Sequence, residues 1–245
     1  MPVFFIADLQ LTEGVLTITG PLLDHLQKSL RVTVGEKLWV SDNRRKRYFI
    51  QVTTVSRMEL RGHVLEEREA PQPYHPTVML AQAILKGDRM DWVIQKATEL
   101  GVRSIVPIIS ERVIARPRIE RLVSQQQRWQ RIAFEASQQA ERWNVPEVFP
   151  AAELLTWLHS PLGELKLILS ERSDEGSLMT IPLPQNAEDR ILLVIGPEGG
   201  WTATEREAAH ASGCTSMSLG PRILRAETAA VAALTIIQSR IGELG

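Results

Sequence analysis

The residues best suited to binding a ligand lie in a glycine-rich stretch, Gly196-Pro-Glu-Gly-Gly200, which follows the continuous apolar run Ile191–Ile195. Such a run is typical of a fully buried strand. Because glycine has no Cβ, backbone N–H and C=O groups in this loop can approach a ligand closely. Thr202 and Thr204 each precede a Glu by three residues, the spacing of a helix-capping box. We therefore expect the loop to join a strand end to a helix start, where open α/β sheets bind ligands.

This loop matches neither of the two common phosphate-binding patterns. No Gly-Lys-Ser/Thr follows it, and the spacing GxGxxG is absent. A tight strand-to-helix turn that binds nothing is the alternative interpretation.

A second stretch, Gly220-Pro-Arg-Ile-Leu-Arg-Ala-Glu-Thr228, repeats the arrangement between a predicted strand and an alanine-rich predicted helix. Both loops begin with Gly-Pro at a strand end, so we expect them to line one pocket. Their polar side chains are those of Glu198, Arg222, Arg225 and Glu227.

The chain shows two regions of different pattern, and both loops lie in the second of them. Residues 1–70 show short alternating runs separated by turn residues, which are typical of a small β-barrel. The predicted strands are Val15–Thr19, Glu36–Val40, Tyr48–Val55 and Glu59–Val64, with one helix at Leu22–Leu30. Three prolines between Ala70 and Pro76 favour extended backbone, so we place a domain boundary there and predict domains 1–72 and 73–245.

Beyond the boundary, strands and helices alternate, which indicates an α/β domain with a mostly parallel sheet and helices on both faces. The predicted strands are Thr77–Leu85, Ser104–Ile109, one starting at Val148, Leu165–Ser170, Ile191–Gly196 and Ser216–Leu219. The predicted helices are Arg89–Leu100, Arg118–Arg142, Ala151–Leu158, Thr204–Ala211 and Glu227–Ile241.

Composition excludes several classes of protein. A single cysteine, Cys214, excludes a disulfide framework, and the five histidines form no metal-binding pair, so we expect no metal. We expect no signal peptide, because the apolar run at residues 3–6 is short and ends before Asp8, and no apolar stretch reaches the length needed to span a bilayer. We therefore expect a soluble cytoplasmic protein with no membrane partner. Residues 86–142 hold 11 Lys and Arg against 7 Asp and Glu. This excess indicates either an RNA-facing surface or solvated helix faces.

Several ordered motifs resemble the SPOUT methyltransferases, and among them the RsmE family, which methylates N3 of uracil in small-subunit ribosomal RNA. Besides the two glycine-containing loops, these motifs are Ile94-Gln-Lys-Ala-Thr-Glu-Leu-Gly-Val102, Ser110-Glu-Arg112, Glu135-Ala-Ser-Gln138 with Arg142, Val145-Pro146, Leu30-Arg31 and Gly35-Glu36. The chain departs from the family pattern in the barrel, where Gly-Asp is replaced by Gly35-Glu36 and Asp-Gly by Asp42-Asn43.

The resemblance implies a PUA-like RNA-binding barrel, followed by a trefoil-knotted SPOUT domain that works as a homodimer with S-adenosyl-L-methionine as cofactor. Its substrate would be small-subunit ribosomal RNA, either free or within an assembled subunit. The implied cofactor-binding residues are Leu169, Ser170, Ile195, Gly196, Pro197, Glu198, Gly199, Gly200, Leu219, Gly220, Ile223, Leu224 and Arg225. The candidate RNA-binding residues are Arg31, Arg44, Arg45, Arg47, Arg112 and Arg116.

Uracil N3 carries a proton that must leave before methylation, so a general base or a charge stabiliser is expected nearby. Arg225 and Glu227 are the candidate catalytic residues, and Glu227 could take this proton or hold Arg225 in place. Glu227 has a further interpretation, since a carboxylate at a helix start also complements the helix dipole. Two alternative functions remain: a SPOUT enzyme acting on another RNA or on a ribose 2′-oxygen, and a non-catalytic RNA-binding protein that kept the fold.

Overall fold

The computed structural model describes residues 3–6, 10–42, 45–113, 119–158, 165–170 and 176–245. The chain divides into two compact units. One comprises Met1–Gln72 with Ser137–Val145, and the other comprises Pro73–Ala136 with Pro146–Gly245. The short segment at 137–145 joins the N-terminal unit although it lies far from it in the sequence, and nothing in its composition indicates this.

The N-terminal unit is a mixed sheet of the order β1-β4-β5-β6-β3-β2 with one helix, α1 (Gly20–Lys28). Its strands are β1 (Val3–Phe5), β2 (Gln10–Thr12), β3 (Val15–Ile18), β4 (Lys37–Ser41), β5 (Lys46–Val55) and β6 (Leu60–Glu69). Among these described strands, β1 and β4 pair in parallel and the other pairs are antiparallel. Register shifts between β5 and β6 mark bulges, which bend a sheet toward a barrel-like form.

The core of this unit is formed by alternate strand residues that point to one side of the bent sheet. Leu16, Ile18, Ile50 and Leu60 are fully buried there, and Leu26 of α1 joins them. The buried residues thus alternate along strands β3 and β5, as expected for strands with one face on a core.

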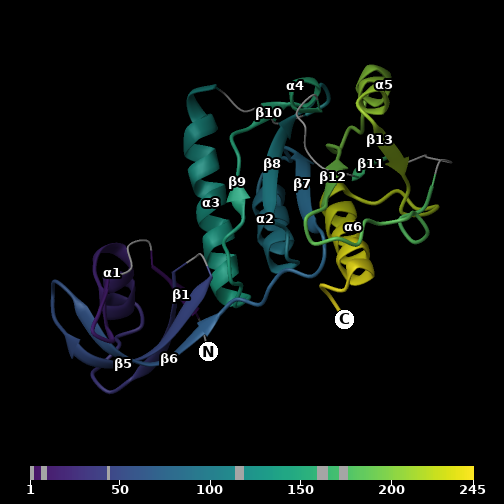
Figure 1. Cartoon of the computed structure of the whole chain (residues 1–245). Coiled ribbons are helices and arrows are strands. Elements are labelled where there is room, and N and C mark those ends of the chain that lie inside the picture. The colour runs from purple at the N-terminus through teal and green to yellow at the C-terminus, as the bar shows by residue number, and fades with distance from the viewer. Residues whose placement is uncertain (1–2, 7–9, 43–44, 114–118, 159–164, 171–175) are drawn as a thin grey trace. The chain divides into compact units, whose positions relative to one another are not determined.

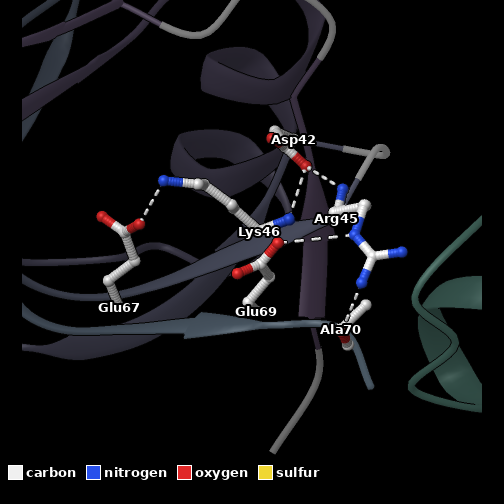
Figure 2. A network of polar contacts seen from close by, with 6 residues as sticks. All are labelled: Asp42, Arg45, Lys46, Glu67, Glu69 and Ala70. Atoms are coloured by element: carbon white, nitrogen blue, oxygen red, sulfur yellow. Dashed lines mark hydrogen bonds and ion pairs between the residues drawn. The ribbon is translucent and has the colours of Figure 1, made fainter. Parts of the chain in front are cut away.

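Strand β6 extends five residues beyond its predicted end, into the charged run Leu65–Glu69. Figure 2 shows the contacts at this end of β6, which involve Glu67, Glu69 and Ala70, together with those of Asp42 and Arg45, which precede β5, and of Lys46, its first residue. The Asp42 carboxylate accepts the backbone N–H groups of Arg45 and Lys46 at 3.1 and 3.0 Å. Lys46 pairs with Glu67, and Arg45 pairs with Glu69 at 3.5 Å. Cross-strand charge pairs thus replace apolar alternation in this part of the hairpin.

The C-terminal unit is built on a parallel sheet of the order β10-β8-β7-β12-β11-β13, with β9 paired to β8 (Figure 1). Its strands are β7 (Thr77–Ala83), β8 (Ser104–Ile109), β9 (Glu147–Val148), β10 (Ala152–Glu153), β11 (Leu165–Leu169), β12 (Arg190–Ile195) and β13 (Cys214–Met217). Its helical segments are α2 (Arg89–Glu99), the 3₁₀ turn Ile119–Arg121, α3 (Leu122–Gln139), α4 (Leu154–Leu158), α5 (Ala203–Ala211) and α6 (Ala226–Ile241), with the last residues of α3 in the other unit.

Strand β12 lies between β7 and β11, and its residues Ile191–Ile195 are all buried. This burial on both faces explains the uninterrupted apolar run in the sequence. Since the strands of this sheet pair in parallel, the loops that follow β7, β11, β12 and β13 emerge at the same edge.

Helices α2 and α6 pack against one another, and the Gln238 side chain of α6 donates to the Leu100 carbonyl at the end of α2, at 2.6 Å. Helix α6 ends at Gly242, whose φ of 87° is the left-handed conformation that terminates helices. Among the described segments, no helix combines the length and the apolar character that crossing a membrane requires.

The predicted capping box at the start of α5 is present. The Thr202 hydroxyl accepts the Glu205 backbone N–H at 3.2 Å, and the Glu205 carboxylate accepts the Thr202 N–H at 2.9 Å. The other Glu205 oxygen accepts the N–H of Glu111 at 2.9 Å, although only 2% of Glu205 is exposed. One buried carboxylate thus fixes both the helix start and the loop after β8.

Replacing Glu205 with Ala should lower the free energy of unfolding by about 1–3 kcal/mol, because two backbone donors lose their acceptor in a buried place. Urea denaturation followed by circular dichroism measures this change. The matched control is Glu207→Ala, an exposed Glu of the same helix, which should change stability by less than about 0.5 kcal/mol. Equal effects of the two substitutions would contradict the role assigned to Glu205.

Candidate active site

A cavity of about 850 Å³ lies at the carboxyl edge of β11, β12 and β13. Its described lining includes Leu169 and Ser170 at the end of β11, the loops that follow β12 and β13, and the start of α6. Every residue predicted to bind the cofactor lines it: Leu169, Ser170, Ile195, Gly196, Pro197, Glu198, Gly199, Gly200, Leu219, Gly220, Ile223, Leu224 and Arg225. The two glycine-containing loops therefore converge on one pocket, as their repeated pattern predicted.

The glycine-rich loop is supported from behind by Trp201. This tryptophan is buried, and its indole N–H donates to the carbonyl of Leu169 at 2.9 Å. A Cβ added to Gly196 would lie 3.1 Å from the indole ring, closer than ordinary contacts allow. Gly196 is therefore required for the close approach of backbone and ring, and the indole braces the loop.

Backbone conformation explains two other glycines of the loops. Gly200 has a φ of 65° and donates its N–H to the Pro197 carbonyl at 3.0 Å, which closes a tight turn. Gly220 has a φ of 109° at the entrance to the second loop. Residues with a Cβ rarely adopt either conformation.

Several polar residues of the cavity wall could not be assigned to it from sequence. Arg206 donates to the Trp201 carbonyl at 3.0 Å, and the His210 Nε2 lies 3.1 Å from the Ser216 hydroxyl. All three of Arg206, His210 and Ser216 line the cavity. Cys214 is on strand β13, and burial raises the pKa of its thiol, so it is no candidate nucleophile.

Arg112 was predicted to contact RNA, and the structure places it in the cavity wall. Its Nη1 donates to the Gly199 carbonyl at 3.1 Å, and the residue as a whole is exposed. Arg112 thus holds the glycine-rich loop while its side chain remains accessible to solvent.

The two candidate catalytic residues have different surroundings. Arg225 is the exposed N-cap residue of α6 and lines the cavity, and its side chain forms no hydrogen bond or ion pair with the described residues. Glu227 lies in the first turn of α6 and is absent from the described lining of the cavity. Its carboxylate faces Arg89 rather than Arg225, with Oε1 3.8 Å from the Arg89 Nε.

Arg89, the first residue of α2, is a part of the site that sequence reasoning missed. It lines the cavity, and its Nη1 lies 3.1 Å from Oε1 of Glu198 in the glycine-rich loop. One guanidinium therefore contacts carboxylates from two of the segments that form the pocket. The signal for it in the sequence is its position at a predicted helix start after a strand.

The predicted RNA-binding residues of the N-terminal unit are not equivalent. Arg31 is exposed and has a φ of 54°. Arg45 is partly buried and joins Glu69 and the Ala70 carbonyl, at 3.5 and 2.9 Å (Figure 2). Arg44, like Arg116 of the other unit, lies outside the described residues.

Arg47 has a structural role instead of the predicted contact with RNA. It is only 9% exposed, its guanidinium lies 3.8 Å from the centre of the Trp143 ring, and its Nη2 donates to the Glu141 carbonyl at 2.6 Å. Burial lowers the pKa of this guanidinium. Arg47 thus attaches residues 137–145 to the sheet, because its planar cation can stack on an indole ring.

The cavity suits S-adenosylmethionine in size and in chemistry. Its volume lies within the range of pockets that enclose small organic ligands. Leu169, Leu219 and Leu224 supply apolar walls for an adenine ring, and the glycines expose backbone donors and acceptors. A valine side chain at Gly196 would collide with the Trp201 ring, so glycine at this position allows the loop to pack against the indole.

Comparison with known proteins agrees with this site. The family model described as an RNA methyltransferase domain matches residues 72–238. The ribosomal RNA small subunit methyltransferase E of Synechocystis is 34% identical over 96% of this chain and 76% of its own length. The protein of the same name from Bacillus subtilis is 29% identical over 90% of this chain and 88% of its own length.

Solved structures show the same fold. The crystal structure of ribosomal RNA small subunit methyltransferase E from Neisseria gonorrhoeae, bound to S-adenosyl methionine, is 33% identical, with a TM-score of 0.88 over 100% of both chains. A Legionella pneumophila protein solved with bound SAM is 29% identical, with a TM-score of 0.86 over 97% of both chains. The predicted fold class, a parallel-sheet SPOUT methyltransferase domain after a barrel-like unit, is confirmed. The chain belongs to the ribosomal RNA small subunit methyltransferase E family.

Proposed function

We propose that this protein transfers a methyl group from S-adenosyl-L-methionine to N3 of a uridine in small-subunit ribosomal RNA. The observation that carries the proposal is the convergence of both glycine-containing loops on one cavity of about 850 Å³. Two further findings support the proposal: the chain belongs to this methyltransferase family, and the relative from Neisseria gonorrhoeae was solved with S-adenosyl methionine bound. Acceptance of the methyl group by N3 rests on the resemblance of the loop motifs.

The two glycine-containing loops of the cavity wall would hold the cofactor. Backbone groups of Gly196–Gly200 and of Leu219–Gly220 would contact the polar atoms, and Leu169 and Leu224 would flank the adenine. When bound, S-adenosylmethionine supplies an electrophilic methyl group. Positioning contributes much of the rate of such a transfer, because the acceptor must lie in line with the methyl carbon.

Arg225 would stabilise the negative charge that uracil carries after N3 loses its proton. It is a permanent cation on the cavity wall with no partner among the described side chains. Glu227 contacts Arg89 and is absent from the described cavity wall, so we assign it a positioning role. The proton of N3 then passes to solvent or to a group of the RNA.

We further propose that residues 1–72 form the PUA-like RNA-binding domain and that the enzyme is a knotted homodimer acting in ribosome biogenesis in the cytoplasm. Arg31 is exposed and offers a cationic group for the phosphate backbone. The dimer rests on the resemblance of the sequence motifs, and light scattering tests it. A monomer at the concentration of the activity assay would contradict it.

The test of the activity is methylation of small ribosomal subunits that carry unmodified RNA, with S-adenosylmethionine labelled in its methyl group. We expect label in the small-subunit RNA and recovery of N3-methyluridine after digestion to nucleosides. Alkaline hydrolysis distinguishes the acceptor atoms, because cleavage requires a free 2′-hydroxyl. A methyl group on the base is released in mononucleotides, and one on the ribose remains in a dinucleotide.

Label in dinucleotides would show a ribose methyltransferase, and label in another RNA alone would show another substrate. Binding of RNA without any transfer of label would show the non-catalytic alternative. Each of these results would contradict the proposal.

A further inference from the structure

We infer that Arg89 is a positioning residue that couples the glycine-rich loop after β12 to the first turn of α6 and thereby sets the shape of the cofactor cavity. The inference rests on the proposed function for its effect on the cofactor. The coupling itself is a property of the protein alone.

The contacts of Arg89 join three segments that are far apart in the sequence. Arg89 begins α2, Glu198 belongs to the loop after β12, and Glu227 lies in the first turn of α6. Its Nη1 lies 3.1 Å from Glu198, and its Nε lies 3.8 Å from Glu227. The backbone N–H of Lys86 donates to the same Glu198 oxygen at 3.2 Å.

The two carboxylates in these contacts are more buried than those of ordinary surface ion pairs. The side chains of Glu198 and Glu227 are only 18% and 15% exposed, whereas that of Arg89 is 44% exposed. The Oε2 atoms of both carboxylates are buried without a hydrogen-bond partner among the described residues. Each carboxylate therefore depends on its Oε1 contacts for charge compensation, and loss of the guanidinium would leave two poorly solvated negative charges near each other.

The geometry also explains why an arginine is required here. The planar guanidinium presents separate N–H groups, so Nη1 and Nε can face different carboxylates. A lysine ammonium is a compact point charge and would favour one carboxylate at a time. Because Arg89 and Glu198 both line the cavity, a shift in this contact would displace the cavity wall.

Arg89→Met tests the inference, with Lys96→Met as matched control. Lys96 is on the same helix and pairs with Glu99 at 2.9 Å, so the control also removes one ion pair of α2. The first measurement is hydrogen exchange of the protein without ligand. Amide protection in residues 196–206 and 225–229 should fall in Arg89→Met and stay unchanged in Lys96→Met.

The second measurement is the affinity for S-adenosylmethionine by calorimetry, at a temperature where each variant is fully folded. Arg89→Met should bind about tenfold more weakly than the wild type, within the range of coupling between contacting residues. Arg89→Lys should restore part of that loss. In the background Glu198→Gln with Glu227→Gln, the additional effect of Arg89→Met should fall to about twofold or less, because the guanidinium then has no carboxylates to hold.

Unchanged loop protection in Arg89→Met would overturn the inference whatever the ligand does. An equal loss of affinity in the double-glutamine background would also overturn it, since Arg89 would then act on the ligand directly. If Arg89→Met does not fold, the test passes to Arg89→Lys. The inference is then contradicted if Arg89→Lys has the same amide protection and the same affinity for S-adenosylmethionine as the wild type. The wild type could also fail to bind S-adenosylmethionine while Arg89→Met still lowers amide protection in the two loops. That result would contradict the proposed function and support the coupling through Arg89.

Discussion

Gly196→Val is expected to weaken the binding of S-adenosylmethionine by roughly 100-fold while the protein stays folded. The Cβ alone would lie 3.1 Å from the Trp201 ring, and the two methyl groups of valine add further bulk. The indole can yield only by moving, which would break its hydrogen bond to the carbonyl of Leu169, another residue of the cavity wall. Calorimetric titration with S-adenosylmethionine measures the effect.

A graded series separates this local effect from general damage. Gly196→Ala adds only the Cβ, so it should cause a smaller loss than valine. Ala203→Val adds bulk at an exposed position just beyond the loop and should leave affinity within about twofold of the wild type. If Gly196→Val binds as tightly as the wild type, the cofactor does not depend on this loop.

The elements that sequence patterns predicted best are those whose burial is nearly uniform along a strand or follows the period of a helix. Strand β8 has the predicted bounds Ser104–Ile109, and α2 differs from prediction by one residue. Most of their apolar residues are buried, so local pattern and final environment agree, with Trp92 of α2 as an exposed exception.

Elements stabilised by distant partners could not be predicted in this way. Strand β1 pairs in parallel with β4, and the exposed β2 shows no apolar alternation. The predicted helix Ala151–Leu158 begins instead with β10, because Ala152 and Glu153 pair with Ile108 and Ile109 of β8. Such pairing depends on which chain segment is adjacent in space, and the local sequence does not encode that directly.

The residues of the site also divide into those that the local sequence predicts and those that depend on distant segments. Its loops were predictable because a glycine and proline pattern at strand ends has a local physical meaning. The place of Arg89 in the site was not predictable from local sequence. Arg89 follows β7, and β7 lies beside β12 in the sheet although the two strands are far apart in the chain. Likewise, Arg47 belongs to a basic run in the sequence, and its burial against Trp143 depends on the segment that follows α3.

Arg225→Ala is expected to slow single-turnover methylation by roughly 100-fold at neutral pH, the range for loss of a group that stabilises a developing anion. Affinity for S-adenosylmethionine should change much less, because the interaction forms only as uracil loses its N3 proton. Arg225 is suited to this role because it lines the cavity without a partner among the described residues. Rapid-quench assays with enzyme in excess over RNA measure the rate.

The pH dependence gives the sharper test of this role. A nearby cation favours the deprotonated form of uracil, so it lowers the pKa of N3 in the complex. Without Arg225 that pKa rises, and the rate of Arg225→Ala should recover as pH increases, so that its deficit shrinks in alkaline solution. Arg225→Lys keeps the positive charge, so its methylation rate should lie between those of the wild type and Arg225→Ala. Glu227→Gln should retain the wild-type shape of the pH profile, because we propose that Glu227, which contacts Arg89, has a positioning role and takes no proton from the substrate. A deficit of Arg225→Ala that is independent of pH would exclude charge stabilisation by this arginine, and loss of the acidic limb in Glu227→Gln would identify Glu227 as the base.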